Sequence, residues 1–216
     1  MNGEKIVIVD YGLGNIHSIC RALEKCGADN FIVSDSPYQI NSADKIILPG
    51  VGSYKDGIDG LRNRGLIEPL VQHGYLNKPI LGICLGMQLL ASSGEEYGLH
   101  DGLNLIPGII KKIPGIVSGD AKRKVPIVGW RNLNFQSNEV DPLFKEIGLS
   151  DEFYFVHSYS FYTNDGGSGN ILASYESHTE KIVAAISFKL IYGLQFHPEK
   201  SGIPGLKIIS NFINLK

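Results

Sequence analysis

The chain has 216 residues, a length that suits one α/β domain with a substantial buried core. Its hydrophobic content of 43% and charged content of 19% are ordinary for a globular protein. A net charge of −2, with no apolar run of membrane-spanning length, argues against nucleic acid and membrane as partners.

The cysteines are odd in number and lack the spacing of metal ligands. Cys20 and Cys26 fall on or just past one predicted helix, where we interpret them as packing residues. No signal peptide precedes Lys5, so we expect a cytoplasmic protein with reduced thiols.

The first predicted elements are a buried strand over residues 5–10 and an amphipathic helix that runs to Cys26 and ends at Gly27. Between them lies Tyr11-Gly12-Leu13-Gly14-Asn15. This Gly-x-Gly pattern lacks the third glycine of a dinucleotide-binding turn, because position 17 is His17. We therefore expect a plain turn or a loop that contacts a partner.

Strands are predicted at Phe31–Val33 and Lys45–Leu48, and helices at residues 54–64 and 66–75. The second strand runs into Pro49-Gly50-Val51-Gly52-Ser53. Proline ends strand pairing, and the glycines leave backbone N–H groups exposed and conformationally free. Such a loop is either an ordinary turn or, beside a nucleophile, the donor of an oxyanion hole.

The most informative stretch surrounds Cys84. The apolar run Ile80–Ile83 predicts a buried strand, and the apolar residues after Cys84 recur with helical spacing. Cys84 thus lies on a strand-to-helix turn between Gly82 and Gly86, the thiol form of a nucleophile elbow. Glycine allows the close approach, and the start of a helix favours the thiolate. A structural cysteine is the alternative, but this context favours a nucleophile.

The order of elements through residue 90 predicts a parallel sheet with helices on both faces. After Glu96 we expect an antiparallel layer joined to the edge of that sheet, followed by a closing helix over residues 203–215. The expected strands of the second half are 105–113, 127–135, 153–156, 171–175, 182–186 and 191–195. The absence of repeats and linkers favours a single domain.

A possible base follows the last strand, in the sequence Gln195-Phe196-His197-Pro198-Glu199. A catalytic cysteine needs a base, and the base needs an orienting carboxylate. His197 and Glu199 are two residues apart, a spacing that places alternate side chains on one face. With the elbow at Cys84 they complete a predicted Cys–His–Glu triad.

These two motifs resemble the class I (triad) glutamine amidotransferases. Within that family, further stretches resemble the glutaminase subunits of imidazole glycerol phosphate synthase. They are residues 9–15, 48–52, 155–159 and 195–201, with Gly205-Leu206 and Asn211-Phe212. Pro49-Gly50-Val51-Gly52 is the most discriminating, because other members usually carry a Gly-Gly-Pro version of this loop.

The resemblance implies a flavodoxin-like α/β fold in a single glutamine amidotransferase type 1 domain over residues 1–216. Cys84 would attack the side-chain amide of L-glutamine and form a glutamyl thioester with release of ammonia. Ammonia would pass to a separate (β/α)8 cyclase subunit, which makes imidazole glycerol phosphate and aminoimidazole carboxamide ribotide in histidine biosynthesis. No cofactor and no metal is implied.

The resemblance also implies roles for individual residues. The backbone of Leu85, Val51 and Gly52 would hold the oxyanion. The substrate glutamine would be bound by Gly52, Gln88, Glu96, Ser158 and Tyr159. Contacts with the cyclase subunit would come from Asn15, Trp130 and Lys200.

Some positions depart from the family pattern. Residues 126–131 read Pro-Ile-Val-Gly-Trp-Arg where the family often has Pro-His-Met-Gly-Trp-Asn, and Thr179-Glu180-Lys181 replaces a Tyr-Gly pair. These departures leave two possible acceptors for the ammonia, because a paralogous subunit serves surface-sugar amidination in some bacteria. Other readings are the glutaminase of another synthase, such as a chorismate-using one, a cysteine hydrolase that shares only the elbow, and an inactive scaffold.

Overall fold

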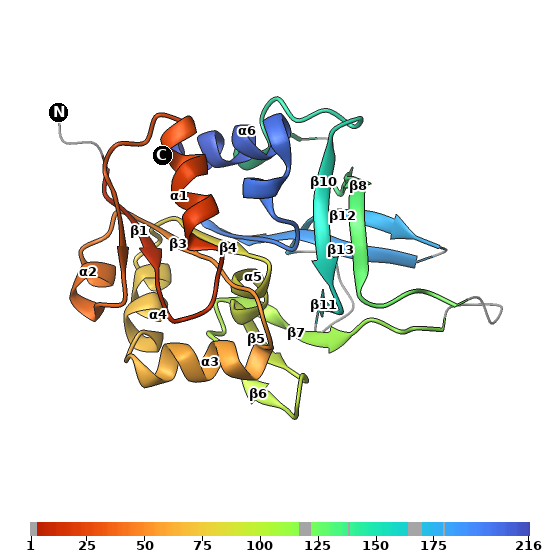
Figure 1. Cartoon of the computed structure of the whole chain (residues 1–216), viewed down its shortest axis with the longest axis horizontal. Helices are drawn as coiled ribbons and strands as arrows, with labels where there is room; N and C mark the ends of the chain where they lie inside the picture. Colours follow the sequence, from red (N-terminus) through yellow and green to blue (C-terminus); the bar gives the residue numbers. More distant parts are fainter. Residues whose placement is uncertain (1–3, 117–121, 138, 164–169, 179) are drawn as a thin grey trace.

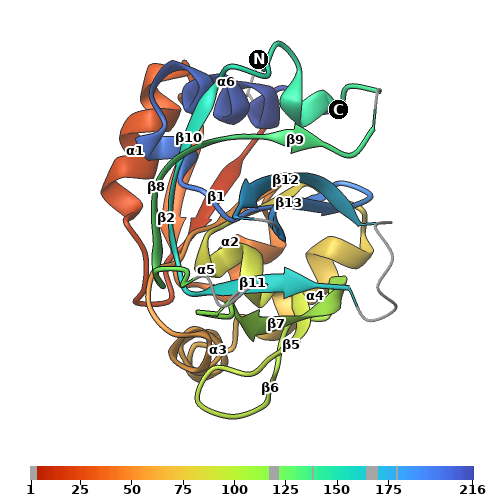
Figure 2. The ribbon, with the colours of Figure 1, turned by 90° about the vertical axis from the view of Figure 1, so that its right-hand side faces the viewer.

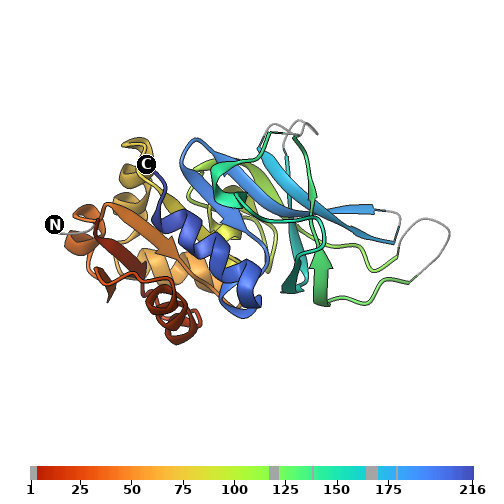
Figure 3. The ribbon, with the colours of Figure 1, turned by 90° about the horizontal axis from the view of Figure 1, so that it is seen from above.

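The computed structural model describes residues 4–116, 122–137, 139–163, 170–178 and 180–216. Thr179, one of the positions that depart from the family pattern, lies outside these ranges. The described strands form sheets of eight, four and two strands (Figure 1). The largest sheet runs through the middle of the molecule, and helices lie on both of its faces (Figures 1 and 3).

The eight-stranded sheet joins a parallel half to an antiparallel half. In spatial order, the parallel strands are β2 (Phe31–Ser34), β1 (Ile6–Val9), β3 (Lys45–Leu48), β4 (Ile80–Ile83) and β14 (Ile191–Leu194). The antiparallel strands β13 (Glu180–Phe188), β12 (Ile171–Ser177) and β9 (Asn134–Phe135) continue from β14. The parallel order is that of flavodoxin-like folds, whose ligands bind at the carboxyl ends of the strands.

The helices separate onto the two faces because alternate residues of each strand point to opposite sides. Ile6 and Ile8 of β1 join one buried cluster, and Val7 and Val9 join the other. The first cluster packs under α1 (Ile16–Lys25) and α6 (Gly202–Ile213). The second packs under α2 (Pro37–Asn41), α3 (Tyr54–Asn63), α4 (Ile67–Tyr75) and α5 (Leu85–Leu89). The predicted α/β architecture with helices on both faces is confirmed.

The predicted antiparallel layer is present, but it is divided among all the sheets. Besides extending the central sheet, it forms the pair β8 (Ile127–Asn132) and β10 (Glu152–His157). It also contributes to a mixed sheet of β11 (Tyr159–Tyr162), β7 (Ile106–Lys112), β5 (Ala91–Gly94) and β6 (His100–Asp101), in which β5 and β7 are parallel (Figure 2). The strand predicted over 127–135 is two strands, because the chain passes from the β10 pair to the β12 edge at buried Leu133.

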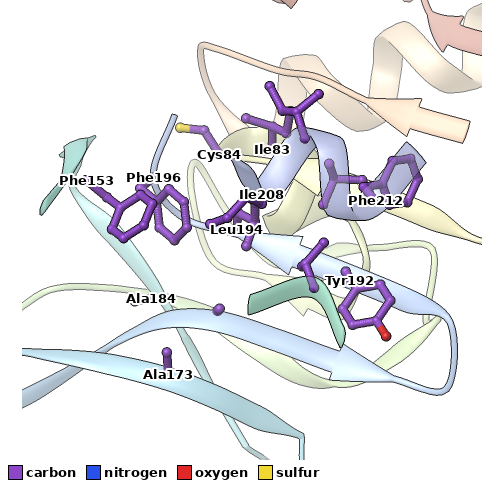
Figure 4. Packing of buried hydrophobic residues seen from close by; sticks show 14 of the residues in the cluster. Ile83, Cys84, Phe153, Ala173, Ala184, Tyr192, Leu194, Phe196, Ile208 and Phe212 are labelled. Atoms are coloured by element: carbon purple, nitrogen blue, oxygen red, sulfur yellow. The ribbon is translucent and has the colours of Figure 1, made fainter. Parts of the chain in front are cut away.

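One hydrophobic cluster reaches the end of β4, where Cys84 begins the turn. Figure 4 shows the Cys84 side chain at the margin of that cluster, with its sulfur turned away from Ile83 and Phe212. Phe153 and Phe196 pack together nearby, with ring centroids 4.5 Å apart. The cluster therefore packs against the turn and leaves the Cys84 sulfur at the edge of the cluster. No helix in the described ranges is long and apolar enough to cross a membrane.

Candidate active site

Cys84 occupies a strained turn between β4 and α5. Its backbone has φ 54° and ψ −109°, outside the usual regions for a residue with a side chain, at a typical cost of about 1–3 kcal/mol. The Cys84 N–H donates to the Leu194 carbonyl at 2.7 Å, which fixes the turn to neighbouring β14. A β carbon on Gly86 would lie 1.8 Å from the Leu48 carbonyl oxygen, so only glycine fits at that position.

His197 and Glu199 lie beside this turn because β14 pairs with β4, with Leu194 opposite Ile83. The His197 Nδ1–H donates to Glu199 Oε1 at 2.8 Å, and their side chains are only 2% and 1% exposed. The His197 N–H donates to the Tyr154 carbonyl at 3.0 Å, which ties the loop to β10. The predicted base and its carboxylate are thus hydrogen-bonded, buried and held from two sides.

The charges around His197 favour its protonated form. Burial opposes the charge, but the neighbouring Cys84 and the hydrogen-bonded Glu199 outweigh burial and raise the pKa of His197 to about 9. With Nδ1 bonded to Glu199, the remaining nitrogen, Nε2, is the one available to Cys84. The arrangement therefore favours a histidine that holds a proton for a leaving group at neutral pH.

A cavity of about 260 Å³ opens in front of the sulfur. It is smaller than the ~300–1,000 Å³ typical of drug-sized ligand sites, so it suits a small molecule. Its lining contains Cys84, His197 and every residue predicted to hold the oxyanion or the substrate: Val51, Gly52, Leu85, Gln88, Glu96, Ser158 and Tyr159. Pro126, Val156 and His157 complete the wall.

The segment predicted to hold the oxyanion is in a closed arrangement. The Leu85 N–H donates to the Gly50 carbonyl at 3.3 Å, so this predicted donor is already engaged. One residue earlier, the Pro49 carbonyl accepts a 2.6 Å hydrogen bond from the buried Tyr11 hydroxyl. Rotation of the Gly50–Val51 peptide would release Leu85 and turn the Val51 N–H toward the cavity.

The predicted substrate-binding residues come from separate elements. Gln88 lies on α5, and its Nε2 donates to the Tyr159 carbonyl at 3.4 Å. Glu96 follows β5, and its Oε2 accepts the N–H of Tyr54, the first residue of α3, at 2.7 Å. The N-terminus of that helix thereby fixes the carboxylate at the cavity wall.

The residues predicted to contact a partner lie along one row of elements. Asn15 caps α1, where its side chain accepts the Ser18 N–H. Lys200 ends η3 (Pro198–Lys200), a short helix that contacts both α1 and β10. Trp130, on the next strand β8, is 47% exposed and packs edge-on against Tyr154, with centroids 5.8 Å apart.

Sequence reasoning missed two buried polar residues of the site. Gln195 is fully buried, and its Nε2 lies 3.8 Å from Cys84 Sγ. His157 lines the cavity and is bonded through both ring nitrogens, to the Tyr159 carbonyl and the Tyr175 hydroxyl, each at 2.8 Å. Both lay in quoted motifs, but only their three-dimensional neighbours give them a role.

A larger cavity of about 440 Å³ lies beside β9, against Phe135, Phe144 and Leu172. Its lining includes the carboxyls of Glu139 and Asp141 and the hydroxyl of Ser137 but neither cysteine nor histidine, so it lacks a thiol nucleophile and a histidine base. Among the described residues, no group of three or more His, Cys, Asp or Glu is arranged to hold a metal ion. The cavity at Cys84 is therefore the candidate active site.

Comparisons with known proteins agree with this geometry. Residues 7–215 match the family model described as glutamine amidotransferase class-I. An imidazole glycerol phosphate synthase subunit HisH of Syntrophotalea carbinolica is 39% identical over 208 residues, covering 96% of this chain and 98% of the relative. A subunit HisH 1 of Legionella pneumophila strain Paris is 41% identical over 213 residues, covering 97% and 99%.

Solved structures with low sequence identity share the fold. PurLQS from Thermotoga maritima superposes with a TM-score of 0.70 at 20% identity, covering 99% of each chain. A glutamine amidotransferase from the same organism gives 0.59 at 18% identity, covering 92% of this chain and 77% of that one. With a family match over nearly its whole length and relatives near 40% identity, the chain belongs to the class I glutamine amidotransferases.

Proposed function

We propose that this chain is the glutaminase subunit of an imidazole glycerol phosphate synthase, acting in histidine biosynthesis as a single domain. The observation that carries the proposal is the cavity at Cys84, where a strained elbow cysteine meets a buried histidine that is hydrogen-bonded to a carboxylate. Full-length relatives named as this subunit, at about 40% identity, support the pathway.

In the proposed first half-reaction, the Cys84 proton resides on His197 Nε2 and the thiolate attacks the amide carbon of glutamine. A carbon–sulfur bond forms, and the carbonyl electron pair moves onto oxygen to give a tetrahedral oxyanion. When the oxyanion collapses, the carbon–nitrogen bond breaks and His197 transfers its proton to the leaving nitrogen. Ammonia departs and a glutamyl thioester remains on Cys84.

In the second half-reaction, neutral His197 removes a proton from water as the oxygen attacks the thioester carbon. The new oxyanion collapses with loss of the carbon–sulfur bond, which frees glutamate and restores the thiolate beside protonated His197. Glu199 orients the ring and stabilises its charge through the 2.8 Å hydrogen bond. Leu85 and Val51 N–H groups stabilise both oxyanions once the segment after β3 has opened.

The polar wall of the cavity suits the α-amino and α-carboxylate groups of glutamine. Glu96 is fixed by the start of α3 and supplies negative charge for the amino group. Gln88 supplies its side chain, whereas Gly52, Ser158 and Tyr159 supply mainly backbone. The substrate amide would then extend toward Cys84 on the opposite wall.

We assign the row of Asn15, Lys200 and Trp130 to the interface with the (β/α)8 cyclase subunit. The row crosses α1, η3 and β8, next to the loop that carries His197, so a partner there would cover the catalytic side of the molecule. Ammonia made at Cys84 would pass into that partner. The described cysteines are free thiols, which suits the reducing cytoplasm that we propose as the location.

The acceptor has one alternative with a specific observation behind it. Arg131 stands where the family often has asparagine, directly after Trp130, and its Nη1 donates to the Trp130 carbonyl at 2.7 Å. A cation at the proposed interface alters charge complementarity with a partner. A partner from a surface-sugar pathway would explain it.

The decisive experiment is a partner exchange. Glutamate release should be measured with the histidine-pathway cyclase and its nucleotide acceptor, and separately with a surface-sugar amidotransferase partner. Stimulation by the histidine cyclase supports the proposal, whereas stimulation by the sugar-pathway partner alone assigns the chain to the alternative. Arg131→Asn is the matched variant. It should strengthen binding to the histidine cyclase only if Arg131 determines the choice between the two partners.

A further inference from the structure

A buried amide lies directly beside the sulfur of Cys84. Gln195 follows β14, is 0% exposed, and places its Nε2 3.8 Å from Cys84 Sγ. Its backbone N–H donates to the Ala184 carbonyl at 2.9 Å, so the residue is held by the neighbouring strand. Burying an amide without hydrogen-bond partners costs free energy. The Cys84 sulfur is one of the hydrogen-bond partners of the Gln195 side chain.

The orientation of this amide is set by Gln88. The Gln88 Nε2 lies 3.1 Å from Gln195 Oε1 and 3.4 Å from the Tyr159 carbonyl oxygen. A carbonyl only accepts hydrogen bonds, so Gln88 must present its NH₂ group to Tyr159. The same NH₂ group then meets the oxygen of Gln195, which leaves the Gln195 NH₂ group facing the sulfur.

The Tyr159 carbonyl is itself fixed by His157. His157 Nδ1 lies 2.8 Å from that oxygen and must therefore carry the proton. Burial lowers the pKa of His157 to about 4, so the ring is neutral at pH 7 and its Nε2 is an acceptor. The Tyr175 hydroxyl, 2.8 Å away, can only donate to it.

Each link in this chain has one permitted direction. The Tyr175 hydroxyl donates to His157, and both His157 and Gln88 donate to the backbone carbonyl of Tyr159. Gln88 also donates to Gln195, whose own NH₂ group donates to Cys84. A donor aimed at sulfur stabilises the thiolate more than the neutral thiol, which is only a weak acceptor.

We propose that Gln195 is a catalytic residue that donates a hydrogen bond to the Cys84 thiolate, held in that orientation by the chain from Tyr175 through Gln88. The inference rests on the proposed role of Cys84 as the nucleophile. It gives the sulfur a second stabilising group besides His197. It also connects Gln88, at the wall of the substrate cavity, to the nucleophile through a single residue.

The test measures iodoacetamide alkylation of Cys84 in the full chain, resolved by peptide mass spectrometry, at pH 7 and pH 10. Gln195→Leu removes the donor and should slow alkylation at pH 7 by about three- to tenfold. This is the effect expected of one hydrogen bond to a charged group when the bond is long and therefore weak. At pH 10, above the ordinary thiol pKa of about 8.5, the alkylation rates of the wild type and the variant should converge. Gln195→Glu keeps the shape but presents oxygen to the sulfur, so it should be slower still at pH 7.

Gln136→Leu is the matched control. Gln136 donates to Ser174 Oγ at 3.3 Å beyond the edge strand β9, so its loss should leave the alkylation rate of Cys84 unchanged. If Gln195→Leu unfolds, as thermal melting would show, the isosteric Gln195→Glu decides. Wild-type alkylation at pH 7 in the folded Gln195 variants would overturn the proposal, as would equal slowing at both pH values.

Alkylation reports on the thiol without glutamine or a partner. Failure of the wild-type chain to hydrolyse glutamine in complex with a loaded partner would refute the proposed function, while normal alkylation of the Gln195 variants with an active wild-type complex would refute only this inference.

Discussion

The closed segment after β3 predicts that this chain alone is a poor glutaminase. The Leu85 N–H is engaged by the Gly50 carbonyl at 3.3 Å, so an oxyanion would meet an acceptor where it needs donors. One backbone hydrogen bond contributes about 0.5–1.5 kcal/mol net, or roughly a 2- to 13-fold preference for the closed segment. Partner binding must supply at least that much to hold the segment open, and complete opening should raise turnover by about that factor.

Val51→Pro tests the open state directly. Proline removes the N–H that we propose as the second oxyanion donor, and glycine at the preceding position tolerates the restriction that proline imposes. Loss of one such donor costs roughly 2.7–4 kcal/mol, or about 10²–10³ in rate. Stimulated turnover should fall by that factor, and unstimulated turnover, which comes from the molecules whose segment is already open, should fall with it. Val51→Ala, which keeps the N–H, is the control.

The assay is glutamate release by the chain alone, with cyclase, and with cyclase plus an acceptor analogue. Equal turnover in all three conditions would refute the switch, and wild-type turnover of Val51→Pro with the loaded cyclase would refute the role of the Val51 N–H. Substitutions at Gly50 are less informative. A β carbon there would lie 2.2 Å from the Tyr11 hydroxyl and would displace the segment by steric overlap.

Three further predictions follow from the buried ionisable groups. Iodoacetamide should modify Cys84 before Cys20 and Cys26 near neutral pH, because burial raises the pKa of those two thiols; equal labelling rates in a peptide mass assay would contradict this. Because the pKa of His197 is raised to about 9 and ammonia departure needs its proton, kcat should fall as pH rises through about 9, and a rate that keeps increasing would exclude His197 as the acid. Burial lowers the pKa of His73 to about 4, below the unfolded value of 6.5, so the unfolded state binds a proton first as pH falls. Between pH 7 and pH 5 this should cost about 2 kcal/mol of unfolding free energy, and His73→Phe should flatten that slope in urea titrations.

The parts of the site that could be predicted are those with local signals. The apolar strand before Cys84 and the glycines around it define an elbow, and the pair of His197 and Glu199 is complete within three residues. The sheet follows from the alternation of strands and helices. Its parallel half is confirmed, and so is the placement of helices on both faces. The catalytic roles remain predictions.

The remainder depends on contacts between distant residues. Gln195 is 111 positions from Cys84, and the N–H of Tyr54 is 42 positions from Glu96, so no local pattern indicates either hydrogen bond. The strand β5 reads Ala-Ser-Ser-Gly, a sequence with weak strand propensity that becomes a strand only because β6 and β7 pair with it. The helix α2 is five residues long, too short for a periodic signal.

The central claim is that Cys84 makes ammonia that a separate subunit consumes. The most direct measurement compares synthesis of imidazole glycerol phosphate by the complex with glutamine and with added ammonium salt, in wild type and in Cys84→Ala. We expect Cys84→Ala to lose glutamine-dependent synthesis and to keep nearly all ammonium-dependent synthesis, because the acceptor chemistry belongs to the partner. Retained glutamine-dependent synthesis, or loss of both activities by a folded complex, would contradict the account.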